Sequence, residues 1–116
     1  MIEDVFCKIL SGELKGDFVY RDEDVAVIKD IHPQAPVHLL VMPVKHFNGL
    51  EDFTEHDGHL LEKMLRVAHR VAQEQGMAEG YRLIINEGQH SGKLVPHLHM
   101  HLLGGKRLGP KMVMEG

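Results

Sequence analysis

The chain has 116 residues and a net charge of −4 with histidine counted as neutral, which is the size of one domain. Its residues are 43% hydrophobic and 26% charged, as in an ordinary globular protein, so no basic field would attract nucleic acid or an anionic membrane. Cys7 is the single cysteine, no apolar run is long enough to span a bilayer, and the first residues lack the pattern of a signal peptide. We therefore expect a single domain over residues 1–116, located in the cytoplasm, with neither a nucleic-acid partner nor a membrane partner.

The first half of the chain predicts a short helix, a hairpin and a third strand. Apolar residues recur at helical spacing over residues 2–10, and Gly12 ends that pattern. The apolar runs at 18–20 and 25–28 are separated by four charged residues, which is typical of two strands joined by a turn. Residues 37–43 form a run of valine, leucine and methionine short enough for a central strand.

The second half predicts a long helix and two more strands. Thr54 and Asp57 resemble a capping box, and Gly76 is a stop signal for the helix between them. One apolar stripe runs along this helix, formed by Leu60, Leu61, Met64, Leu65, Ala68, Val71 and Ala72. Residues 81–86 and 96–105 predict the last two strands. Because most connections are too short for parallel crossovers, we expect an α+β fold with helices packed on an antiparallel sheet.

Residues 96–105, PHLHMHLLGG, carry three histidines at alternate positions. Side chains two residues apart share one face of a strand, so His97, His99 and His101 would line one face while the apolar residues between them enter the core. The glycine-bearing loop of residues 87–92 enters this strand, and glycines allow backbone N–H groups to approach an anion closely.

Three uses of this histidine row stay open from the pattern alone. The histidines can be polar residues on a solvated sheet face. They can bind zinc, whose ligands must converge at ~2.0–2.1 Å on one point, which adjacent i, i+2 pairs achieve more easily than i, i+4 pairs. One of them can instead attack phosphorus as a nucleophile. Alternation does not decide between the metal site and the nucleophile.

The wider sequence resembles the histidine triad (HIT) superfamily, and within it the Hint-like nucleoside phosphoramidase branch. Residues 97–103 match the family signature His-φ-His-φ-His-φ-φ, in which φ is apolar. The blocks 5–14, 25–46 and 81–88 are similar to other blocks of the family, in the same order and at the same distances. The resemblance covers nearly the whole chain, and it implies a HIT-like fold whose five-stranded antiparallel sheet, with one short and one long helix, extends across a homodimer.

The resemblance also implies an enzyme, a HIT-family hydrolase similar to adenosine 5′-monophosphoramidase. Its substrate would be a purine nucleotide or nucleoside phosphoramidate, whose P–N bond is hydrolysed through a nucleotidyl-histidine intermediate without a cofactor. His99 matches the nucleophile and His101 the phosphate contact, while His97 and His38 match a supporting pair. Two other functions stay open: hydrolysis of dinucleoside polyphosphates, and nucleotide binding or scaffolding with residual activity.

Further residues match the nucleotide contacts of the family. Asp30, next to Ile31, matches a carboxylate that accepts hydrogen bonds from the ribose hydroxyls. Asn86 and Gly92 match contacts on the phosphate side. The apolar pocket for the base would be formed by Phe6, Ile9, Leu14 and Ile28.

The chain departs from the family just before the triad. Lys93 and Leu94 follow the glycine where a polar pair ending in serine or threonine is usual. Leu94 therefore lacks a hydroxyl toward the phosphate or the leaving group, and Lys93 could contact the phosphate or point into water. The loss of one well-placed transition-state donor commonly costs ~10²–10³ in rate, so efficiency and leaving-group preference are in question.

Some bacterial relatives hold structural zinc through a Cys-x-x-Cys pair near the N-terminus, a histidine after the third strand and the first triad histidine. This chain has Asp4, Cys7, His46 and His97 at those positions, and carboxylates do bind zinc. We expect no metal, and keep these four residues as the alternative.

Overall fold

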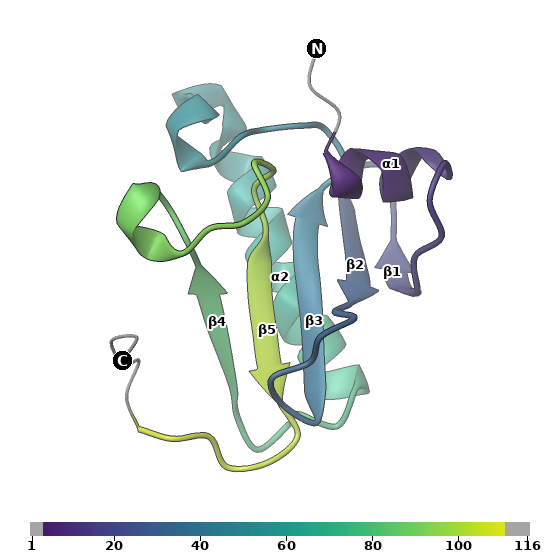
Figure 1. Ribbon diagram of the computed structural model, residues 1–116. Helices are drawn as coiled ribbons and strands as arrows, with labels where there is room; N and C mark the ends of the chain where they lie inside the picture. Colours follow the sequence, from purple (N-terminus) through teal and green to yellow (C-terminus); the bar gives the residue numbers. More distant parts are fainter. Residues whose placement is uncertain (1–3, 111–116) are drawn as a thin grey trace.

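The computed structural model describes residues 4–110, which form a five-stranded antiparallel sheet and two α-helices (Figure 1). The strand order is β1-β2-β3-β5-β4. In chain order the elements are α1 (Val5–Ser11), β1 (Phe18–Arg21), β2 (Val25–Lys29), β3 (Val37–Pro43), α2 (Gly58–Glu74), β4 (Tyr81–Ile85) and β5 (Met100–Gly104). Short 3₁₀ segments lie at Leu50–Asp52, Glu55–Asp57 and Gln89–Ser91. The predicted α+β class and the order of elements are confirmed.

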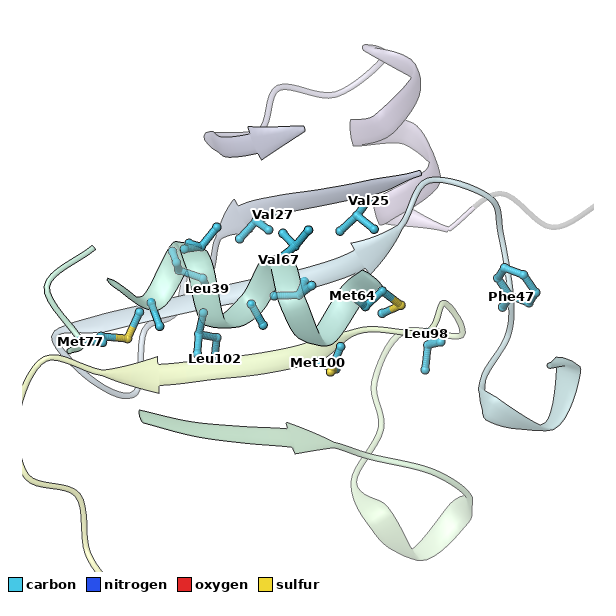
Figure 2. Close-up of a cluster of buried hydrophobic side chains, with 14 residues drawn as sticks. Val25, Val27, Leu39, Phe47, Met64, Val67, Met77, Leu98, Met100 and Leu102 are labelled. Carbon is cyan, nitrogen blue, oxygen red and sulfur yellow. The ribbon is translucent and has the colours of Figure 1, made fainter. Parts of the chain in front are cut away.

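The two helices cover opposite faces of the sheet (Figure 1). α2 packs on one face, where Leu98, Met100 and Leu102 are buried with side chains of α2 and β3 (Figure 2). α1 packs on the other face, where Phe6 and Leu10 meet the alternate residues of β2 and β3. The period-two alternation of residues 98–102 is therefore as predicted, and it directs the intervening histidine side chains toward the α1 side.

The last strand is shorter than predicted, because β5 begins only at Met100. The backbone N–H of His97 donates to the carbonyl of Val95 (2.8 Å), and that of Leu98 donates to the carbonyl of Phe47 (2.7 Å). These bonds replace the strand ladder before Met100 and fix the approach of the chain to β5.

Both helices differ slightly from the prediction. Thr54 and Asp57 do form a capping box, but they cap the 3₁₀ segment that precedes α2. On α2, Leu65 is 45% exposed, whereas Val67, which the predicted stripe omitted, is buried. Residue 2, assigned to the first helix by its spacing, lies outside the described residues. None of the helices within residues 4–110 is long and apolar enough to cross a membrane.

Candidate active site

A cavity of about 1010 Å³ opens on the sheet face that carries α1. The imidazoles of His99 and His101 line one part of it, and apolar side chains from α1, β2 and β3 line another. The predicted contacts that the cavity brings together are Phe6, Ile9, Ile28, Asp30, Ile31, Asn86, Gly92, Leu94, His99 and His101. The cavity thus brings together residues that lie more than ninety positions apart in the sequence.

Two predicted nucleotide contacts lie outside the cavity wall. Leu14 is 43% exposed, because its backbone N–H donates to the carbonyl of Lys8 and turns the chain away after α1. Lys93 takes neither of the two orientations considered from sequence: its ammonium group donates to the Asn48 carbonyl and lies 3.7 Å from the Glu87 carboxylate. Its neighbour Leu94 lies on the cavity wall and is 92% exposed.

The sequence reasoning missed the connection between α1 and β1, which forms part of the wall through Lys15, Gly16 and Asp17. A Cβ atom on Gly16 would lie 2.4 Å from the Cγ2 atom of Ile9, so only glycine lets this connection pack so closely on α1. That glycine, beside two charged residues, is the one sequence signal that could have identified the wall.

His99 is held as a neutral imidazole with a defined tautomer. Its Nδ1 atom lies 2.6 Å from the carbonyl oxygen of His97, and because a carbonyl can only accept, Nδ1 carries the proton. Nε2 is then the unprotonated nitrogen. Burial lowers the pKa of His99, and the edge-on ring of Phe6, 5.0 Å away between centroids, packs against the imidazole. This arrangement leaves a lone pair available at neutral pH.

His101 has the opposite tautomer, and His38 sets it. The backbone N–H of Gln34 donates to His38 Nδ1 (3.0 Å), so the proton of neutral His38 is on Nε2. That Nε2–H group is 2.9 Å from His101 Nδ1 and donates to it, which leaves the His101 proton on Nε2. Asp30 Oδ2 lies 3.3 Å from the same His38 nitrogen.

Electrostatics keep this pair uncharged. Burial first, and then the neighbouring imidazoles of His99 and His38, lower the pKa of His101 to about 4. Burial also lowers the pKa of His38, and the Asp30 carboxylate opposes that shift only in part. The wall therefore presents, side by side, an unprotonated nitrogen on His99 and an N–H donor on His101, with 5.1 Å between ring centroids.

The His97 ring does not line this cavity. It is fully buried beside Asp4, Cys7 and His46. His97 Nδ1 is 3.2 Å from Asp4 Oδ2 and 3.5 Å from Cys7 Sγ. His46 Nδ1 is 3.1 Å from the same carboxylate oxygen and 3.2 Å from the same sulfur. The four candidate metal ligands therefore converge, with their donor atoms all within 4.8 Å of one another.

The chemistry of this cluster fits a zinc ion. His97 Nε2 lies 3.2 Å from the carbonyl of Pro43, so its proton is there and its Nδ1 lone pair faces the Asp4 carboxylate. Two lone pairs that face each other in a buried site need a proton or a cation between them, and burial lowers the pKa of His97. One sulfur, two imidazole nitrogens and one carboxylate oxygen form a zinc donor set. His46 Nε2 lies 2.8 Å from Asn48 Oδ1, so both histidines make outward hydrogen bonds of the kind that is usual around zinc.

Comparison with known proteins agrees with the fold and with the histidine pattern. Residues 3–113 match the family model described as "Scavenger mRNA decapping enzyme C-term binding". Purine nucleoside phosphoramidase of Escherichia coli (strain K12) is 43% identical over 115 residues, 98% of this chain and 97% of that protein. A HIT family hydrolase from Clostridium thermocellum has 45% identity and a TM-score of 0.92, covering 97% of this chain and 99% of that chain. A histidine triad protein from Clostridium difficile has 36% identity and a TM-score of 0.90, covering 97% and 98%.

Fold, histidine pattern and relatives together define a HIT-type hydrolase. The chain belongs to the histidine triad (HIT) family. The predictions of this family, of a five-stranded antiparallel sheet with two helices and of a hydrolase are thereby confirmed. The continuation of the sheet across a homodimer and the roles of individual residues are proposals developed below.

Proposed function

We propose that the protein hydrolyses the P–N bond of purine nucleoside phosphoramidates, with the nucleotide bound in the cavity beside His99 and His101. The observation that carries this proposal is the pair of hydrogen bonds that set opposite tautomers on the two histidines. A nucleophilic nitrogen and a hydrogen-bond donor side by side suit attack on a phosphorus atom whose oxygens gain charge. The choice of the P–N bond is supported by the name of the 43% identical relative.

The remaining cavity residues suit a nucleoside monophosphate. The apolar part formed by Phe6, Ile9 and Ile28 would enclose the base, and its volume is in the range of small-ligand sites. Asp30 Oδ1 accepts a hydrogen bond from the backbone N–H of His32, which orients the carboxylate that would accept from the ribose hydroxyls. Gly92 has φ +81° and would present its backbone toward the phosphate.

The reaction takes place in two displacements. In the first, the His99 Nε2 lone pair forms a bond to phosphorus while the P–N bond breaks. The leaving nitrogen takes the electron pair of that bond and one proton from solvent, while the His101 Nε2–H group donates a hydrogen bond to the phosphoryl oxygens. The His97 carbonyl stabilises the imidazolium formed on His99. In the second, water attacks phosphorus, the pair of the Nε2–P bond returns to His99, and one proton returns to solvent.

Single-turnover kinetics with a fluorogenic adenosine phosphoramidate test this function. The wild type should release the amine, His99→Ala should lose turnover but keep nucleotide affinity, and Leu94→Ser should be as fast or faster, because it restores a hydroxyl near the phosphate. Nucleotide binding without turnover in the wild type would favour the binding module. Faster cleavage of a dinucleoside polyphosphate than of any phosphoramidate would favour the polyphosphate hydrolase.

We also propose that the protein acts as a homodimer, in the cytoplasm, with the sheet continued across the edge of β4. β4 is the last strand in the sheet order, and all five of its residues are partly exposed. An unpaired strand edge is a template for a second strand. On α2, the apolar side chain of Leu65 is exposed, so it is available for burial against a second subunit. Light scattering should give the mass of a dimer, and a monomeric mass at micromolar concentration would contradict this.

The cluster of Asp4, Cys7, His46 and His97 would hold a zinc ion as a structural cross-link rather than as a reagent. The ion would supply a bond between the start of α1, the segment after β3 and the segment before β5. None of these four residues lines the cavity. The hydrolysis itself is proposed to need no cofactor.

A further inference from the structure

A second cavity, of about 590 Å³, adjoins the first one beside His101. The two cavities share Asn86 and His101. The floor of the second cavity is the face of the sheet next to His101, where Ile84 pairs with His101 and Arg82 pairs with Leu103. Its rim is formed by residues 106–109, which follow β5. A ligand whose phosphorus is at His101 can therefore extend into either cavity.

The second cavity carries a local positive charge in a chain whose net charge is −4. Its described lining residues include Arg82, Lys106 and Arg107 and no carboxylate. The Arg82 guanidinium donates to the carbonyl of Gly109, which holds the rim against the sheet. The same three cations also border a third cavity, of about 530 Å³, where Glu79 is the only carboxylate among the described lining residues.

We propose that the second cavity is the leaving-group subsite, and that it favours amines that carry a carboxylate. This inference rests on the proposed function. The apolar cavity would hold the base, and the leaving nitrogen must depart on the side of phosphorus opposite His99 Nε2. From there the leaving group can extend past Asn86 and His101 into the second cavity, because the two cavities share these residues. Arginine and lysine pair with carboxylates through charge-assisted hydrogen bonds, so the second cavity would stabilise an anionic leaving group more than a neutral one.

The proposed dimer is compatible with this subsite. Continuation of the sheet would use the backbone N–H and C=O groups at the edge of β4. The side chains of Arg82 and Ile84 stand on one face of the sheet, and edge pairing leaves that face open.

The test compares two adenosine phosphoramidates, one of β-alanine and one of β-alaninamide, which differ in one negative charge. The quantity measured is the ratio of their kcat/KM values in the wild type, in Lys106→Gln/Arg107→Gln and in Lys106→Glu/Arg107→Glu. Because the intrinsic reactivity of the two amines is the same for every variant, it cancels when these ratios are compared. Arg66→Glu, on α2 at the opposite face of the sheet, is the control for a change of net charge.

The carboxylate-to-carboxamide ratio should fall about two- to tenfold in the glutamine variant and further in the glutamate variant. The fall should shrink when ionic strength is raised from about 0.05 M to about 0.5 M, and Arg66→Glu should keep the wild-type ratio. Equal ratios in all variants would overturn the proposal. Diadenosine tetraphosphate is added as a third substrate. If the substitutions lower kcat/KM only for this compound, the proposal is also overturned, because the cations would then bind a polyphosphate.

Binding separates failure of this inference from failure of the proposed function. Affinities of the two phosphoramidates for His99→Ala, with and without the Lys106 and Arg107 substitutions, report the subsite without turnover. If the wild type hydrolyses neither compound, the proposed function fails, and the change in the affinity ratio still tests the subsite: a fall supports it and no change overturns it.

Discussion

Stability at mildly acidic pH depends on His101, because burial and the neighbouring imidazoles lower its pKa to about 4 in the folded protein. In the unfolded chain a histidine titrates near ~6.5. The unfolded state therefore takes up the proton first as the pH falls, so this contribution to stability is complete above the unfolded value and is lost between there and about pH 4. Between about pH 7 and about pH 5 the linkage lowers the free energy of unfolding by about 2 kcal/mol.

Urea unfolding of the wild type and of His101→Gln at these two pH values measures this effect. Glutamine cannot be protonated, so the loss of stability on acidification should be smaller in the variant by about 2 kcal/mol. His59→Gln, at an exposed position of α2, is the matched control and should keep the pH dependence of the wild type. The same pH dependence in the wild type and in His101→Gln would refute the assignment of a neutral, partly buried His101.

Three further predictions concern the walls of the site. Asp30→Asn should raise KM about tenfold for an adenosine phosphoramidate, since a hydrogen bond to a charged group contributes roughly 1.5 kcal/mol. The KM of the 2′,3′-dideoxy analogue should not change. Equal effects on both compounds would refute a contact between Asp30 and the ribose hydroxyls. Gly16→Ala should lower the free energy of unfolding by about 1–3 kcal/mol because its methyl group would overlap Ile9, whereas Gly58→Ala, whose methyl group meets no atom within 4 Å, is the control; similar thermal midpoints would contradict this. Cys7→Ser should reduce the zinc content of protein prepared with zinc supplied and lower its thermal midpoint, and a wild type without zinc under the same conditions would exclude the metal centre.

The elements that could be predicted are those whose periodicity is set locally. The alternation of residues 98–102 identified the buried residues because side chains in extended chain alternate whatever they pack against. The start of β5 could not be predicted in the same way. It depends on the hydrogen bond between Leu98 and the Phe47 carbonyl, which joins segments 51 residues apart in the sequence and has no local signal.

The candidate site was predictable where a residue's place follows from the strand pattern or from resemblance, as for His99, His101 and Asp30. It was not predictable where the position of a residue depends on hydrogen bonds or ion pairs for which the sequence offers several partners. Lys93 pairs with Glu87 and the Asn48 carbonyl, and Leu14 turns away from the cavity after α1. The basic lining of the second cavity could not be predicted from the sequence either, because Arg82 lies in β4 whereas Lys106 and Arg107 follow β5.

The central claim is that an uncharged imidazole at position 99 attacks phosphorus, and trapping the covalent intermediate tests it most directly. The measurement is mass spectrometry of the protein quenched with base during turnover of an adenosine phosphoramidate, because P–N bonds to histidine are labile in acid, with the adduct mapped by proteolysis at alkaline pH. We expect an adenylyl group on the peptide that contains His99, attached to that residue and missing from His99→Ala. An adduct on His97 or His101, or turnover that proceeds at the wild-type rate in His99→Ala, would contradict it.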